Sequence, residues 1–126
     1  MSNANVIFPH AMPEFITLSE TIRVAQKTDR GIALRRNGTI PGVGTYAAGI
    51  ALLDVENDEL VAIATSGIVV ARVTAAATIT PDMLLCVGAG GTVTPVTAAE
   101  TPIGRSLDSS TGSTSDSPHY VRVKVN

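Results

Sequence analysis

The histidines and the cysteine are the first residues to examine for chemistry. The chain of 126 residues has two histidines, His10 and His119, and one cysteine, Cys86. A metal centre normally gathers several His, Cys or carboxylate ligands, whereas these residues are far apart in the sequence. Cys86 lies between apolar neighbours, and a reactive thiol needs a lowered pKa and access to solvent. We expect Cys86 to be a buried small hydrophobe and His119, beside Tyr120, to lie at the surface.

Two further clusters have the composition of a ligand site without its spacing. The run Gly88–Gly91 lacks the Gly-Lys-Ser/Thr ending of a phosphate loop and leads into strand-like residues, which predicts a hairpin turn. The acidic run lacks the central glycine and final glutamate of a calcium loop, so we expect a solvated loop. Its carboxylates are Asp54, Glu56, Asp58 and Glu59.

No group of residues provides a nucleophile, a base and an oxyanion site together. The serines of Ser66-Gly67 and of Gly104-Arg105-Ser106 do not stand in the GxSxG pattern of a nucleophile elbow. The sequence therefore predicts a protein that is not an enzyme, with no cofactor and no metal, whose function is to bind and hold.

The composition indicates one domain that gains from a partner. Hydrophobic residues make up 44% of the chain but aromatic residues only 3%, so the core consists of Ala, Val, Ile and Leu. Such small side chains bury little area, and apolar area stabilises by roughly 25 cal/mol per Å². We therefore expect an oligomer or a domain docked on another protein.

The charge pattern argues against two classes of partner. The formal net charge is −2, and only Arg35 and Arg36 are adjacent among nine scattered basic residues. Nucleic-acid binding normally needs a clustered basic face with stacking aromatics, so no nucleic-acid partner is expected. No apolar run approaches the roughly 18 residues of a membrane span, and the first residues do not resemble a signal peptide. We expect no membrane partner and synthesis in a cytoplasm.

Short runs rich in Val, Ile and Thr, separated by turn residues, predict an all-β barrel or sandwich. The expected strands are 21–25, 31–34, 46–53, 60–64, 67–74, 83–87, 92–96, 101–107 and 120–125. In the last of these, Val121, Val123 and Val125 alternate with Arg122 and Lys124, which is the strongest strand signal in the chain. The charged face is predicted to protect an edge strand from unwanted pairing.

The first residues are predicted to form an extended arm, residues 1–20, ahead of a β-rich domain, residues 21–126. Pro9 and Pro13 interrupt regular structure, yet the segment is apolar and holds both phenylalanines of the chain. It either covers the core of its own domain or becomes ordered on a partner. The expected anchors are Val6, Ile7, Phe8, Met12, Phe15 and Ile16, with Ile22 just beyond them.

The order of motifs in the second half resembles the small capsid-decorating proteins of tailed bacteriophages. The matching segments are Ser66–Val69, Ala77–Leu84, Gly91–Pro95, Pro102–Leu107 and Val121–Val123. The resemblance covers about the last sixty residues well and the first half loosely. It departs from the family pattern at Pro81-Asp82, where the family has Gly-Asp, in a form compatible with a turn before a strand.

This resemblance to lambda-type head-decoration proteins implies a β-clip (β-tulip) domain with an N-terminal arm. It implies a homotrimer on the outer surface of the virion capsid, made in the cytoplasm of the bacterial host. The implied partner is the major capsid protein, whose subunits the trimer cements together, and the implied contact is the arm.

Two other functions stay open at this point. The chain could be a receptor- or carbohydrate-binding module of a phage fibre or spike, with the polar loop 108–118 as its reading surface. It could also be an accessory domain of β-clip type beside a separate catalytic polypeptide.

Overall fold

The computed structural model describes residues 13–125, and within them the chain consists of strands, loops and one turn of 3₁₀-helix. The strands are β1 (Phe15–Arg23), β2 (Ala33–Leu34), β3 (Gly49–Ala51), β4 (Leu60–Arg72), β5 (Leu84–Val87), β6 (Val93–Pro95), β7 (Pro102–Ser106) and β8 (Tyr120–Val125), with η2 (Ala89–Gly91) between β5 and β6. The prediction of a small all-β domain is confirmed. No helix in the described residues is long and apolar enough to cross a membrane.

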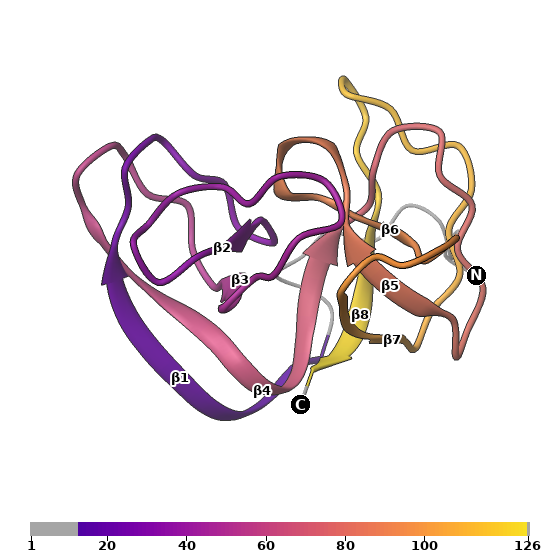
Figure 1. The fold of residues 1–126 in the computed structure, drawn as a ribbon, viewed down its shortest axis with the longest axis horizontal. Helices are drawn as coiled ribbons and strands as arrows, with labels where there is room; N and C mark the ends of the chain where they lie inside the picture. The colour runs from indigo at the N-terminus through magenta and orange to yellow at the C-terminus, as the bar shows by residue number, and fades with distance from the viewer. Residues whose placement is uncertain (1–12, 126) are drawn as a thin grey trace.

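The strands form one sheet that curls on itself (Figure 1). Its order is β2-β3-β4-β8-β7-β5-β6, with β1 also paired to β4, and the pairs between these strands are antiparallel. A parallel bridge between Val73 and Val93 brings the chain just after β4 to β6. The five strands from β4 to β6 therefore make a nearly closed barrel.

The long strand β4 connects the two halves of the molecule. One half consists of β1, β2, β3 and the first part of β4, and the other is the barrel. It was expected as two strands, 60–64 and 67–74, but it runs continuously from Leu60 to Arg72. Ile63 and Ala64 pair with β3, while the stretch from Gly67 to Arg72 pairs with β8. Figure 1 shows β1 and β4 curving together along one side of the molecule.

The bend between these halves falls at Gly67. This glycine has φ 112° and lies where the β1–β4 register shifts. A side chain there would collide with the carbonyl oxygen of Phe15. The glycine therefore allows one strand to turn while it keeps its partner, as in a β-bulge.

Two hydrophobic clusters fill the interior, and the larger extends from the barrel to Ala33 of β2 and Ile50 of β3. The larger lies among the strands of the barrel and includes Val69, Ile79, Leu85 and Val123. The smaller lies between β1, β3 and the first half of β4, and includes Ile63. The largest fully buried side chains are Leu, Ile and Val, as expected from the composition.

Strand β8 confirms the predicted alternation and corrects the predicted position. Val121, Val123 and Val125 are buried, and Lys124 is exposed. However, β8 lies between β4 and β7, so the prediction of an edge strand is wrong. Its charged residues lie on the outer face of the sheet. The prediction failed because alternation indicates a half-buried strand but not the place of that strand in the sheet order.

The expected boundary between residues 20 and 21 falls inside a continuous strand. Phe15–Arg23 is one element, paired with β4 from Ile68 to Leu60. Residues 15–20 therefore belong to the sheet, because their backbone hydrogen bonds are made with β4.

Candidate functional site

The free edge of β1 is the clearest surface for binding another protein. Among the described residues β1 hydrogen-bonds to no strand other than β4, so its outer row of N–H and C=O groups is open for an added strand. Two large apolar side chains stand on this strand, Phe15 at 68% exposed and Leu18 at 64%. An open backbone edge beside exposed apolar groups is the combination used in β-strand addition.

The predicted anchor residues divide into three groups. Val6, Ile7, Phe8 and Met12 lie outside the described residues. Phe15 is exposed on the edge strand, and Ile16 is half-buried against the larger cluster. Ile22, at 7% exposed, belongs to the smaller cluster of the chain's own core, so its side chain is not free to contact a partner.

An ion pair fixes the point where the chain enters β1. One carboxylate oxygen of Glu14 lies 2.6 Å from Arg30 Nη2, and the other accepts a hydrogen bond of 2.7 Å from the Val70 N–H. Both side chains are largely buried. Glu14 thus provides an acceptor for a backbone N–H of β4 just beyond Ile68, the last residue that pairs with β1. The sequence analysis missed this pair, because its partners are 16 and 56 residues away from Glu14.

The residues that were candidates for chemistry have structural roles instead. Cys86 is buried, as predicted, and burial raises the pKa of its thiol, which leaves it in the unreactive protonated form. The run Gly88–Gly91 forms the turn around η2 between β5 and β6, as predicted. Among residues 13–125 no three His, Cys, Asp or Glu side chains gather where they could hold a metal ion.

The polar loop 108–118 is anchored at its base and was not expected to be. Ser110 and Ser113 are buried, and Ser110 exchanges backbone hydrogen bonds with Ile79. His119, which was expected at the surface, is half-buried. Its backbone N–H donates to Ser113 Oγ, and its ring Nδ1 lies 3.1 Å from Ser110 Oγ. The rest of the loop is mostly exposed, at Ser109, Thr111, Gly112 and residues 114–117.

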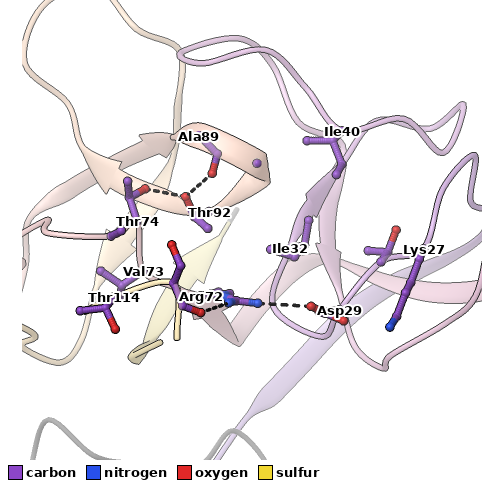
Figure 2. A pocket seen from close by; sticks show the side chains of 14 residues that line it. Lys27, Asp29, Ile32, Ile40, Arg72, Val73, Thr74, Ala89, Thr92 and Thr114 are labelled. Atoms are coloured by element: carbon purple, nitrogen blue, oxygen red, sulfur yellow. Dashed lines mark hydrogen bonds and ion pairs between the residues drawn. The ribbon is translucent and has the colours of Figure 1, made fainter. Parts of the chain in front are cut away.

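A cleft of about 440 Å³ opens where the two halves of the molecule meet (Figure 2). Arg72 crosses it to Asp29 at 3.2 Å. On the opposite wall Thr74 Oγ1 and Thr92 Oγ1 lie 2.6 Å apart, and Thr92 Oγ1 donates to the Ala89 carbonyl. Arg72, Asp29, Thr74 and Thr92 are thus partnered within the chain.

Comparison with known proteins agrees with a binding role. Residues 17–125 match the family of phage cement proteins. No curated protein matches the chain in sequence. A solved structure with the same fold is that of the N base of head fibre gp8.5 in bacteriophage phi29, with a TM-score of 0.60 and 18% identity over 86% of this chain and 98% of that chain. At that identity the likeness shows the fold, whereas the family match spans nearly all the described residues. The chain therefore belongs to the phage cement protein family.

Proposed function

We propose that this cement protein binds the outer surface of the phage head and holds neighbouring major capsid protein subunits together. Its role is structural: it decorates the head and stabilises the capsid. The observation that carries the proposed mode of binding is the free edge of β1 with Phe15 and Leu18 exposed on it. Residues 1–12 precede β1 in the sequence, and we propose that Val6, Ile7, Phe8 and Met12 extend the contact.

The β1 edge suits this role for an energetic reason. Main-chain hydrogen bonds along an added strand give affinity without depending on one deep pocket. Burying Phe15 and Leu18 adds roughly 1.5–3 kcal/mol for each side chain. Many copies around a shell then act together, so individually modest contacts stabilise the whole assembly.

A trimer is the assembly that we propose on the shell. The core contains small aliphatic side chains, while Phe15, Leu53 and Leu60 are exposed. Assembly would cover part of this apolar surface. This proposal is consistent with a domain whose core alone gives modest stability.

Co-sedimentation with undecorated heads tests the β1 edge. The full chain should bind saturably, while a chain without residues 1–12, and the double variant Phe15→Ser/Leu18→Ser, should each bind at least tenfold more weakly. Truncation at residue 12 keeps Glu14 and the whole of β1, and a thermal melt checks that the truncated chain is folded. A longer deletion through Leu18 would also remove the Glu14–Arg30 pair.

The matched control is Val43→Ser, which removes a similarly exposed apolar side chain between β2 and β3. It should bind heads like the unaltered chain. Equal binding by the truncated chain, the double variant and the control would rule out the proposed contact. Sedimentation with host envelope material instead of heads would favour the receptor-binding alternative.

A further inference from the structure

A row of side chains with a basic centre crosses the outer face of the sheet. In the strand register Ile68 of β4 lies opposite Lys124 of β8, Lys124 lies opposite Arg105 of β7, and Arg105 lies opposite Leu84 of β5. Phe15 of β1, opposite Ile68, extends the row to the edge strand. Residues directly opposite each other share a face, so these five form one basic row, about 19 Å long at the usual strand spacing.

The two charges at the centre of the basic row are uncompensated. Like charges directly opposite each other destabilise a sheet, and neither Arg105 nor Lys124 has an ion-pair partner among the described residues. Arg122, two residues before Lys124 on the same strand, is paired with Asp108. Arg105 and Lys124 also line a shallow groove of about 290 Å³ with Leu84 and Ile103. The row is therefore suited to an acidic partner with apolar groups beside the charges.

The chain itself carries such a partner at its other end. The acidic loop, residues 53–59 between β3 and β4, has four exposed carboxylates. Leu53, at 62% exposed, and Leu60, the first residue of β4, at 56% exposed, flank them. The loop is held in shape by a backbone bridge between Val55 and Thr28 and by the Glu59 carboxylate, which accepts from the Glu56 N–H at 2.8 Å. An ordered loop loses little conformational entropy on docking.

The two surfaces cannot meet within one molecule. Leu60 begins β4, and Ile68 lies eight residues further along the same strand, about 26 Å away at the usual rise per residue. Figure 1 shows the start of β4, next to the acidic loop, well apart from the end of β8 that carries Lys124. A contact between the row and the loop must therefore join two copies.

We propose that the basic row of one copy binds the acidic loop of the next, head to tail. An interface between two different surfaces closes into a ring when the rotation between copies permits. This gives a contact for the proposed trimer, and it rests on that part of the proposed function, not on capsid binding through β1. Phe15 belongs both to the β1 edge and to the basic row. The test therefore leaves Phe15 unchanged and alters charges only.

Charge reversal with rescue tests the contact, with sedimentation equilibrium at low salt as the readout. Arg105→Glu/Lys124→Glu reverses the row. Asp54→Asn/Glu56→Lys/Asn57→Lys/Asp58→Asn gives the loop a net charge of +1, and asparagine suits the positive φ of 68° at position 58. Each variant should be monomeric where the unaltered chain associates, and the chain carrying all six changes, with a negative row and a positive loop, should associate again. Added salt should weaken association of the unaltered chain.

The matched control, Arg35→Glu/Arg36→Glu, makes the same change in net charge outside both the row and the acidic loop and should associate normally. Thermal melts of all variants establish that they are folded. A monomeric unaltered chain, a row variant that still associates, or failure of the combined variant to recover would each overturn the proposal. If the row variant associates normally but loses binding to heads, the row is a capsid contact and the self-association proposal is wrong, while capsid decoration stands.

Discussion

Gly67 is the residue on which the pairing of β1 with β4 most depends. An alanine there would adopt an unfavourable φ of 112° and also collide with the Phe15 carbonyl. Gly67→Ala should lower the free energy of unfolding by at least about 2 kcal/mol. The matched control is Gly90→Ala, where φ is also positive but the side chain would meet open space, so the cost should be about 1 kcal/mol. Urea unfolding measures both, and equal costs would contradict a steric role for Gly67.

The Asp108–Arg122 pair makes stability depend on pH. Burial acts to raise the pKa of Asp108, but hydrogen bonds from the side chain and backbone N–H of Arg122 outweigh it, and the pKa lies below its usual value. A carboxyl whose pKa is lowered by folding stabilises the protein fully at pH values above its pKa in the unfolded chain, about 3.9. This stabilisation is lost as the pH falls through the lower pKa of the folded state.

Asp108→Asn should therefore cost about 1–3 kcal/mol at pH 7, and the difference from the unaltered chain should shrink as pH falls below about 4. Free energies of unfolding at several pH values measure this. A difference that stays constant down to pH 2 would show that the ionised carboxylate is not what stabilises the fold.

At the scale of the strand, Glu14 fixes where β1 begins. Glu14→Gln removes the charge opposite the largely buried Arg30 and weakens the acceptor for the Val70 N–H. The expected cost is about 1–3 kcal/mol, with faster amide hydrogen exchange at Val70. Glu20→Gln is the matched control, because Glu20 pairs with Arg36 at the exposed surface, where ion pairs contribute little. Similar losses for both would contradict the special role of Glu14.

The strands show what local sequence patterns can and cannot predict. Val121, Val123 and Val125 alternate with polar residues, and the burial of these valines follows from that period of two. The position of β8 between β4 and β7 depends on pairing between distant segments, which the alternation does not encode. The same limit explains why Glu14 was missed, because its partners Arg30 and Val70 come together only in the folded sheet.

The candidate site was predictable in part. The apolar character of residues 1–20 drew attention to Phe15, which the structure places exposed on strand β1, while its role as an anchor stays a prediction. Ile22 was grouped with it by residue type, although its side chain faces the core. Composition alone could not separate them, because only the register with β4 decides which side chains are covered.

At the scale of the whole molecule, the fold combines a nearly closed barrel with open surfaces. The bridge between Val73 and Val93 leaves the barrel with little exposed edge, whereas β1 keeps a free edge. One end carries the acidic loop, and the outer sheet carries the basic row. In our proposals the barrel is the scaffold, the β1 edge binds the head, and the acidic loop and basic row join copies.

The central claim is that this protein stabilises a phage head by binding to it, and heat-induced DNA release from undecorated heads tests that claim most directly. Adding the purified chain should raise the temperature of DNA release, and the increase should level off as binding to the heads saturates. The chain without residues 1–12, at the same concentration, should give a much smaller increase. If heads saturated with the protein release their DNA at the same temperature as undecorated heads, the claim is wrong.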